Sequence, residues 1–385
     1  MFDKKLLGNN IKRERERHGM TQSQLAEKLY LTYQSVSGWE RGTHPPDLDN
    51  ICELSKIFGI SIDTLLFKRC GYDRYMVAVD GGGSKTEFVL FTESGEVIRR
   101  EKLSSSNPNS GGAENCISVL LQGIERLRSD AYKIDAIFVG IAGGASSVAT
   151  AQIVRTLQEK YGSCSVSCDS DTVNVLGFAP DPLNAMGMIV GTGSSVFFRN
   201  NGLMQYTGGW GYLFDKGGSG FDIGRDAIRE ALSASDGMKD GNEFVEIITS
   251  EIGEARKNLG ELYRMNVQGV ASLAPVVFRA AGKGNKDALS ILERNAGRMA
   301  ELIKTAQKKS GYKGKIIGGG SLLRDAIYKD MIQEKSGVEI MVPEIPPIYG
   351  AAVECCLRNG IKTDESFGEK FAVSYKRRKQ ENAEN

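Results

Sequence analysis

Three short glycine-rich runs, each directly after an apolar segment, constrain what this 385-residue chain can fold into. Glycine has no side chain, so backbone N–H groups in such a run can approach a phosphate closely. One glycine turn is weak evidence, whereas three in the same position predict nucleotide binding by an α/β fold. The runs are residues 80–86, 191–195 and 318–321, and the apolar segments before them are residues 76–79, 186–190 and 315–317.

The first two runs share a further property, because a second apolar strand follows each of them, at residues 87–91 and 196–198. Each is therefore a strand–turn–strand hairpin, and the repetition predicts two related lobes with a nucleotide site in the cleft between them. Neither hairpin is a Walker A loop, which needs Gly-Lys before its Thr and a helix after it. Asp80, at the end of the first strand, is placed to hold Mg²⁺ through water.

The first 70 residues show a different pattern, in which apolar residues recur at the spacing of short helices. Leu7 and Ile11 lie four apart, and Ile51 and Leu54 lie three apart. Strands and glycine turns begin only after this region. We therefore expect a helical domain at 1–68, a linker at 69–74, lobes at 75–185 and 186–372, and a disordered basic and polar tail at 373–385.

Residues 19–26, 35–42 and 58–66 resemble a helix-turn-helix of the Cro/C1 (XRE) repressor type, and the resemblance spans residues 7–67. It implies a small all-α domain whose helix at 32–41 enters the major groove of duplex DNA as part of a homodimer. The alternative is a helical bundle that binds another protein. The DNA-contacting residues that the resemblance implies are Gln22, Thr32, Tyr33, Gln34 and Ser37.

The glycine runs belong to a longer series of motifs between about residues 75 and 358. The motifs are 80–86, Ser106 with Asn107, 140–144, Asp171, 191–194, 208–211, 218–220 and 318–320. In this order they resemble the BadF/BadG/BcrA/BcrD ATPase and N-acetylglucosamine kinase group of the actin/sugar-kinase/Hsp70 superfamily. The resemblance implies a two-lobed α/β domain of actin-like ATPase (ribonuclease H-like) fold. It also implies that this domain binds ATP, Mg²⁺ and an amino sugar such as N-acetylglucosamine.

The resemblance assigns a role to each motif. Asp80 is implied to be a catalytic and metal-binding residue, and Asp215 a second catalytic carboxylate. The implied sugar-binding residues are Asn107, Gly144, Asp171 and Trp210. The implied nucleotide-binding residues are Gly81, Gly82, Gly83, Ser84, Lys85 and Thr86 around the γ-phosphate, Gly191, Thr192, Gly193 and Ser194 around the other phosphates, and Gly318, Gly319 and Gly320 around the adenosine.

Two positions depart from the sugar kinases of this group. The residue that commonly supplies the base for the attacking hydroxyl is Ala145 here, and Lys216 stands near a usual acid. Removal of a general base typically slows catalysis by about 10²–10⁴-fold. Two hypotheses, which do not exclude each other, follow: an ATP-dependent amino-sugar kinase fused to a DNA-binding domain, and a transcriptional regulator that senses the sugar.

A third function, ATP-driven activation of a 2-hydroxyacyl-CoA dehydratase, is disfavoured. Activators of that class hold an iron–sulfur cluster through Cys around the second glycine run, where this chain has Ser194 and Ser195. His18 and His44 are the only histidines, so the large domain has no His-based triad or zinc–water site. The 7 Cys lack a C-x-x-C spacing, and no apolar run reaches the length of a membrane span, so we expect a cytoplasmic protein with reduced thiols.

Overall fold

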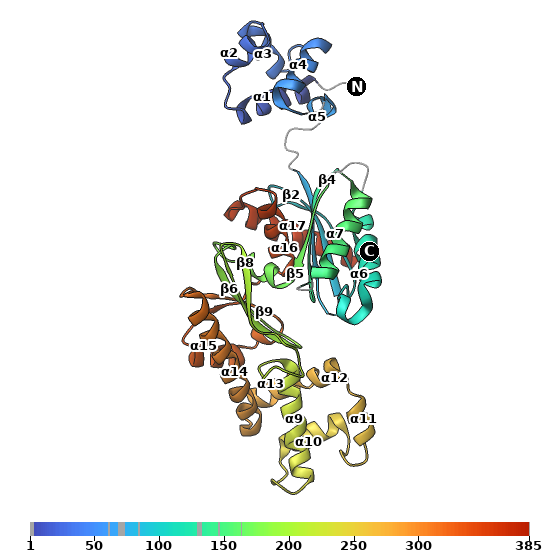
Figure 1. The fold of residues 1–385 in the computed structure, drawn as a ribbon, viewed down its shortest axis with the longest axis vertical. Coiled ribbons are helices and arrows are strands. Elements are labelled where there is room, and N and C mark those ends of the chain that lie inside the picture. The colour runs from blue at the N-terminus through green and yellow to red at the C-terminus, as the bar shows by residue number, and fades with distance from the viewer. Residues whose placement is uncertain are drawn as a thin grey trace. The chain divides into compact units, whose positions relative to one another are not determined.

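The chain divides into two compact units, Met1–Arg74 and Tyr75–Asn385, called here the N-terminal unit and the large unit (Figure 1). The computed structural model describes residues 4–60, 62–67, 74–83, 85–128, 133–144, 147–162 and 164–384. Ser84, Ala145 and the predicted linker up to residue 73 lie outside these ranges. Within the described ranges, none of the helices combines the length and the apolar character needed to cross a lipid bilayer.

The N-terminal unit is a bundle of short helices, as predicted. Thr21 caps the second helix through a capping box with Gln24, and Asp47 caps the fourth by accepting from the Asn50 N–H. Gly59 ends the fourth helix in the left-handed conformation. The helices are α1 (Lys4–Arg17), α2 (Gln22–Lys28), α3 (Tyr33–Glu40), α4 (Leu48–Phe58) and α5 (Ile62–Phe67).

The large unit contains two five-stranded sheets with the same topology. In the first sheet β1 pairs antiparallel with β2 and parallel with β4, and in the second sheet β6 pairs antiparallel with β7 and parallel with β9. The strand orders are β3-β2-β1-β4-β5 and β8-β7-β6-β9-β10 when both are read from the antiparallel edge. The strands are β1 (Tyr75–Gly81), β2 (Lys85–Thr92), β3 (Val97–Ser104), β4 (Ile134–Ile141), β5 (Ser165–Ser170), β6 (Ala185–Val190), β7 (Ser194–Asn200), β8 (Leu203–Gly208), β9 (Ile316–Gly319) and β10 (Ile340–Met341).

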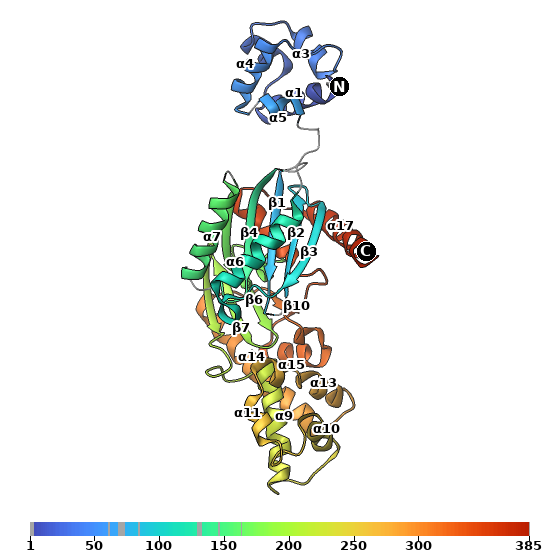
Figure 2. The ribbon, with the colours of Figure 1, turned by 90° about the vertical axis from the view of Figure 1, so that its right-hand side faces the viewer.

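This duplication confirms the predicted two-lobed α/β architecture. Helices α6 (Pro108–Leu127) and α7 (Ser147–Tyr161) cover one face of the first sheet, and α16 (Ile348–Arg358) and α17 (Glu365–Glu384) cover the other (Figures 1 and 2). Alternation along the strands explains this, because Ala78 and Phe91 pack among residues of α16 and α17. Phe88 points the opposite way, toward Gly123 of α6.

The second sheet carries most of the remaining helices. Helix α14 packs on β7 and β8, and α8 lies against β6, β9 and α16, where it connects the two sheets. A helical segment, α9 to α13, is inserted between β8 and α14 (Figure 2). The helices are α8 (Thr172–Leu176), α9 (Gly220–Ser235), α10 (Glu243–Ile252), α11 (Leu259–Arg264), α12 (Val267–Ala271), α13 (Ala274–Gly282), α14 (Lys286–Ser310), the 3₁₀ turn η1 (Leu322–Arg324) and α15 (Ala326–Ser336).

The C-terminal region corrects two predicted boundaries. The second lobe does not extend to residue 372, because α16 and α17 return to the first sheet. Residues 373–384 are not disordered but continue α17. Phe367, Phe371 and Tyr375 recur every four residues along this helix, are buried, and place two rings against Phe91. This aromatic face outweighs the basic run that suggested a solvated tail.

Candidate functional site

In the N-terminal unit, helices α2 and α3 form the helix-turn-helix pair. Thr32 caps α3 by accepting a hydrogen bond from the Ser35 N–H. Thr32, Tyr33 and Gln34 are exposed and Ser37 is half-buried, so the predicted recognition surface at the start of α3 is open to solvent. Tyr30, in the turn before α3, is 96% exposed and has a positive φ of 56°. The sequence analysis did not identify this residue.

Gln22 is predicted to contact a DNA phosphate, but its side chain already makes a hydrogen bond within the helical bundle. Gln22 Nε2 donates to Glu40 Oε2 at 2.6 Å, and Glu40 also forms a buried ion pair with Arg15 at 2.6 Å. Gln22 therefore ties α2 to α3, and its amide is partly committed within the bundle. Gly38 of α3 is buried, and a Cβ there would lie 2.1 Å from His44 Cε1, so this position does not face a ligand.

In the large unit, Asp80 lies at the end of β1 beside the first glycine turn. Its register partner on β4 is Gly140, where a Cβ would lie 2.2 Å from Asn174 Oδ1. This missing side chain admits Asn174 of α8, whose Nδ2 donates to Asp80 Oδ1 at 2.7 Å. Loss of solvation raises the pKa of Asp80 to about 7, against the lowering effect of the Asn174 hydrogen bond. Asn174 is fully buried, and the sequence analysis missed it.

The predicted sugar-binding residues gather at the carboxyl ends of β4 and β5. Asn107 caps α6, and its Oδ1 accepts from the Asn109 N–H at 2.9 Å. Gly143 has a φ of +81°, and a Cβ there would lie 2.9 Å from Asn107 Oδ1. The Asp171 N–H donates to the carbonyl of Ile141 at 3.0 Å. The structure thus brings Asn107, the turn that contains Gly144, and Asp171 to one edge of the first sheet.

Asp171 is a second carboxylate with a raised pKa. Loss of solvation raises the pKa of Asp171 to about 6, and the Ser170 hydroxyl, which donates to it at 3.2 Å, acts in the opposite direction. Asp171 precedes α8 but makes no side-chain cap, so its side chain is not used to begin the helix. Carboxylates with raised pKa values at the carboxyl edge of parallel strands are typical of functional sites.

The second glycine turn joins β6 to β7 and has an open face. The Gly191 N–H donates to the Gly193 carbonyl at 2.9 Å, and a Cβ on either glycine would meet nothing within 4 Å. The Gly220 N–H, at the start of α9, donates to the Gly191 carbonyl at 2.7 Å. Ser194 Oγ is buried and has no hydrogen-bond partner in the structure. An oxygen-rich ligand above this turn satisfies such a group.

The third glycine turn lies against the second. Gly320 has a φ of +95°, and a Cβ there would lie 2.2 Å from the Val190 carbonyl at the end of β6. Gly318, Gly319 and Gly320 line a small hollow of ≈ 40 Å³ together with Val175 and Phe178 from the α8 region. Its other walls are Arg324, Val342, Pro343, Ile345 and Pro347, so most of its lining residues are apolar, as is usual for a small-molecule site.

The remaining predicted site residues, Trp210 and Asp215, lie in the loop after β8. Asp215 is half-buried, and its Oδ2 accepts from the Gly211 N–H of its own loop at 2.9 Å. Lys216 is exposed, and Trp210 is 77% exposed. The structure therefore gives Asp215 a contact within its own loop, and among the described residues neither Asp215 nor Trp210 has a bonded link to Asp80 or Asp171.

The donor set fits Mg²⁺ held mainly by a nucleotide. In the part of the chain that the structure describes, no group of three or more His, Cys, Asp or Glu side chains could hold a metal ion by itself. Mg²⁺ commonly takes one or two carboxylates and completes its shell with phosphates and water. Asn174 engages one oxygen of Asp80, and that carboxylate stands beside the open glycine turn. Asp80 is therefore a suitable single protein ligand.

Comparison with known proteins agrees with this arrangement. Residues 77–355 match the model of the BadF/BadG/BcrA/BcrD ATPase family, and residues 11–65 match a helix-turn-helix model. The chain is 26% identical over 306 residues to the N-acetyl-D-glucosamine kinase of Dictyostelium discoideum, which covers 72% of this chain and 96% of that protein. It is 29% identical over 299 residues to the N-acetylmuramic acid/N-acetylglucosamine kinase of Clostridium acetobutylicum, covering 73% of this chain and 97% of that protein.

A solved structure shows the same fold. It is a provisionally named N-acetylglucosamine kinase from Chromobacterium violaceum, with a TM-score of 0.60, 20% sequence identity, and coverage of 73% of this chain and 98% of that chain. The predicted family resemblances are confirmed. This chain belongs to the BadF/BadG/BcrA/BcrD ATPase family and carries a helix-turn-helix domain at its N-terminal end.

Proposed function

We propose that this family member is a DNA-binding regulator whose large unit binds ATP with Mg²⁺ and an N-acetylhexosamine, and transfers phosphate slowly or not at all. The observation that carries the proposal is the cluster at the carboxyl edge of the first sheet. Asp80 lies there beside the first glycine turn, Asn107 lies beside Gly143, and the Asp171 N–H bonds to the Ile141 carbonyl, in the same chain as a helix-turn-helix. The two kinases similar to this chain act on N-acetylated sugars by name, which supports that class of ligand.

In this proposal each residue has a distinct task. The glycine turns at 81–86 and 191–194 hold the phosphates through backbone N–H groups, and a Cβ on Gly83, Gly191 or Gly193 would meet nothing within 4 Å. Asp80 holds Mg²⁺, which neutralises charge on the phosphates and supplies electrostatic stabilisation for phosphoryl transfer. The adenosine lies on the side of Gly318–Gly320, where the hollow of ≈ 40 Å³ marks only a part of the space that it occupies. Asn107 and Asp171 accept hydrogen bonds from sugar hydroxyls, while Gly144 and Trp210 shape the sugar pocket.

The reaction step that this site supports least well is removal of the proton from the attacking hydroxyl of the sugar. Ala145 cannot act as a base, and Asp215 is held by the Gly211 N–H in its own loop. Asp171 has a pKa raised to about 6, closer to neutral pH than an ordinary Asp, but its first task is to bind the sugar. We therefore favour ligand sensing over rapid turnover.

Sensing requires that ligands in the large unit alter DNA binding by the N-terminal unit. A homodimer places two α3 helices on two half-sites, with Thr32, Tyr33, Gln34 and Ser37 facing bases and Gln22 facing a phosphate. Ligands that change the distance between the paired units change the affinity for the operator. This function places the protein with the chromosome in the cytoplasm.

Fluorescence anisotropy of a labelled operator duplex tests the proposal with the intact protein. We expect salt-sensitive DNA binding whose dissociation constant changes at least fivefold when N-acetylglucosamine and Mg-ADP are added together. The duplex is taken from a selection against random DNA, so no operator is assumed. DNA binding that is unaffected by every combination of sugar and nucleotide contradicts the sensing function.

A kinase assay separates the remaining alternative. We expect wild-type turnover well below the range of about 1–100 s⁻¹ that is usual for kinases. Ala145→Asp should raise it, because the carboxylate supplies the missing base. Wild-type turnover within that range contradicts the sensor-only account and identifies the chain as a sugar kinase that also binds DNA.

A further inference from the structure

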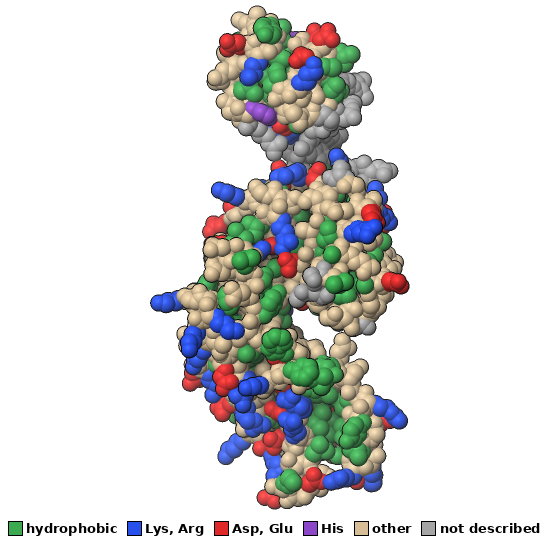
Figure 3. Space-filling view, in the orientation of Figure 1, with side chains coloured by type: hydrophobic (Ala, Val, Ile, Leu, Met, Phe, Trp, Pro, Cys, Tyr) green, Lys and Arg blue, Asp and Glu red, His purple; other side chains and the backbone are tan. Residues whose placement is uncertain are grey.

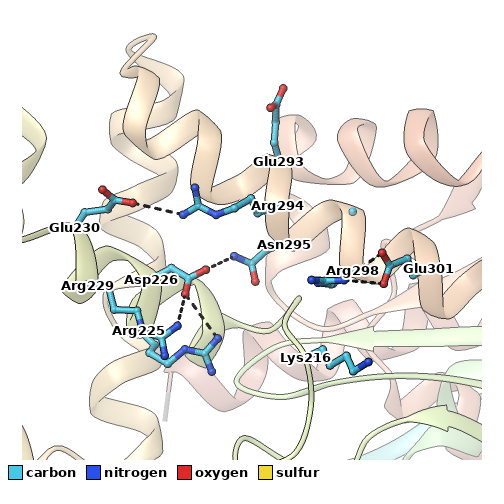
Figure 4. Close-up of a pocket in the computed structure, with 11 residues that line it drawn as sticks. Lys216, Arg225, Asp226, Arg229, Glu230, Glu293, Arg294, Asn295, Arg298 and Glu301 are labelled. Carbon is cyan, nitrogen blue, oxygen red and sulfur yellow. Dashed lines mark hydrogen bonds and ion pairs between the residues drawn. The ribbon is translucent and has the colours of Figure 1, made fainter. Parts of the chain in front are cut away.

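A hollow of ≈ 590 Å³ lies on the large unit between α9 and α14, outside the glycine-turn site (Figure 4). Cationic side chains converge on it from two helices and one loop. In the space-filling view, Lys and Arg side chains gather over this part of the large unit (Figure 3). The residues used below are Lys216, Arg225, Arg229, Arg294, Arg298 and Asn295.

The carboxylates in the hollow do not saturate these cations. Arg225 is already paired with the buried Asp222 at 2.9 Å, and it reaches Asp226 at 3.6 Å. Arg229 reaches Asp226 at 3.4 Å, and Arg294 reaches Glu230 at 3.5 Å. A well-formed charged hydrogen bond between such groups is about 2.7–2.9 Å long. Each guanidinium has five N–H donors, so these long contacts leave donors available for a further acceptor.

The remaining charges strengthen this conclusion. Glu230 is already neutralised by Lys239 at 2.9 Å, so Arg294 is not needed for that purpose. Arg298 pairs with the exposed Glu301 at 3.0 Å, an interaction that solvent screens. Lys216 has no ion-pair partner among the described residues. Glu293 is the one carboxylate of the lining that the structure leaves without an ion pair in those residues, and it is exposed.

We propose that this hollow is a second ligand site, which binds the phosphate group of a small phosphorylated molecule. Planar guanidinium groups bind phosphate oxygens through paired hydrogen bonds, and Lys216 adds a point charge. The volume lies within the range of about 300–1,000 Å³ that is usual for small-molecule sites. The exposed Glu293 provides a polar group for a hydroxyl of the ligand.

The site also contacts the loop that leads to the sugar pocket. Asn295 is buried, its Oδ1 accepts from the Gly218 N–H at 2.8 Å, and its Nδ2 donates to Asp226 at 3.2 Å. Lys216 lies in the same loop, next to Asp215. A phosphate bound here draws Lys216 and the arginines around Asp226 toward itself, and so acts on residues 215–218. The site is thus placed to regulate the loop that carries Asp215 and Lys216.

Calorimetric titration with inorganic phosphate at constant ionic strength tests the proposal. The glycine turns also offer a phosphate site, so the titration is made in the Gly193→Val background. We expect one remaining phosphate site, which the double substitution Arg294→Gln/Arg298→Gln weakens by at least about tenfold. The control is Arg256→Gln/Arg264→Gln, which removes two exposed arginines outside the hollow and should leave the affinity unchanged.

Two results overturn the proposal. One is the absence of phosphate binding in the Gly193→Val protein, and the other is an affinity that Arg294→Gln/Arg298→Gln does not change. Unchanged melting temperatures show that each variant is folded. If the nucleotide site fails its own tests, this proposal is still decided by comparing the phosphate affinity of Arg294→Gln/Arg298→Gln with that of Arg256→Gln/Arg264→Gln.

Discussion

The two sheets of the large unit have the same strand order but different chemistry at the end of the first strand. In the first sheet, the last residue but one of β1 is Asp80, which has a raised pKa and a hydrogen bond from Asn174. In the second sheet, β6 ends at Val190 and the following turn has only backbone groups and the hydroxyls of Thr192 and Ser194. In the function proposed above, the duplicated fold therefore provides two phosphate cradles, and the side chains of the first sheet would hold the metal and the sugar.

This difference has an electrostatic consequence. Two carboxylates with raised pKa values, Asp80 and Asp171, stand at the first sheet without a cation bonded to them among the described residues. A metal ion or a hydroxyl donor compensates such groups, whereas the neutral turn of the second sheet needs only an anion to accept its N–H donors. The predictions below test this division of labour.

The largest expected effect comes from a substitution that blocks the second glycine turn, 191–194, which has no charged side chain. Gly193→Val places a side chain where the ligand-free structure has open space, so the fold tolerates it while a phosphate does not. We expect Mg-ADP affinity to fall by more than about 100-fold, or 2.7 kcal/mol, in a calorimetric titration. Gly241→Val is the matched control, because its Cβ also meets nothing within 4 Å and lies outside the turn. Equal affinities in both variants contradict the second cradle.

The next effect concerns the metal at the first sheet. Asp80→Asn keeps the shape and the hydrogen bond from Asn174 but removes the charge. We expect Mg²⁺ to improve ADP binding by at least about tenfold in the wild-type protein and not at all in the variant. Titrations with Mg²⁺ and with EDTA measure this ratio. If the variant retains the full dependence on Mg²⁺, Asp80 does not hold the metal.

Asp171→Asn tests the sugar end of the same sheet. A hydrogen bond to a charged group contributes about 1.5–3 kcal/mol, so we expect N-acetylglucosamine affinity to fall by about 10–100-fold. Titration of the sugar into protein saturated with Mg-ADP measures this loss. Affinity within twofold of the wild-type value shows that Asp171 does not contact the ligand.

The same substitution should change the pH dependence of stability in the ligand-free protein. The folded-state pKa of Asp171 is raised from 3.8 to about 6, so the native state binds more protons than the unfolded state between these values. The wild-type protein therefore loses stability, relative to Asp171→Asn, as pH rises from about 4 to 6, and the difference stays constant above pH 6. We expect this loss in the free energy of unfolding, relative to Asp171→Asn, to be about 2 kcal/mol. It is less than the full pKa shift implies because the carboxylate is partly exposed. Urea denaturation at pH 4.5 and pH 7.5 measures it.

The smallest effect comes from Ser194, whose buried hydroxyl has no hydrogen-bond partner among the residues that the structure describes. Ser194→Ala should stabilise the ligand-free protein by up to about 1 kcal/mol and weaken Mg-ADP binding by about fivefold. Thr207 Oγ1 in β8 is also buried without a partner, but it lies opposite Val196, away from the turn. Thr207→Val should stabilise the protein without changing nucleotide affinity. If it weakens binding equally, the Ser194 hydroxyl has no specific role.

Much of this asymmetry was predictable from the sequence. The apolar runs before the glycine turns predict both hairpins, because buried strands and tight turns have strong local signals. Asn107 and Asp171, 64 positions apart in the chain, were identified through resemblance to a family, since no local pattern brings them together. The structure shows the contacts that do so, through Gly143 and Ile141.

Two other features, the Asn174–Asp80 hydrogen bond and the packing of α17, could not be predicted from local sequence patterns. A single Asn in the apolar stretch around residue 174 gives no indication that its amide reaches Asp80, because Gly140 must first leave room for it. The return of α17 to the first sheet was hidden by the basic run at 376–379, although Phe367 and Phe371 carried the helical period. Such long-range packing depends on the sheet that receives it.

The most direct test of the account is the coupling between the two ligands, measured by calorimetry on the intact protein. The two cradles and the sugar residues belong to one site, so saturating N-acetylglucosamine should raise Mg-ADP affinity by about 5–150-fold. Saturating Mg-ADP should raise the affinity for the sugar by the same factor. Failure of either ligand to bind, or two independent affinities, contradicts the claim that this fold unites a metal-and-sugar cradle with a neutral phosphate cradle.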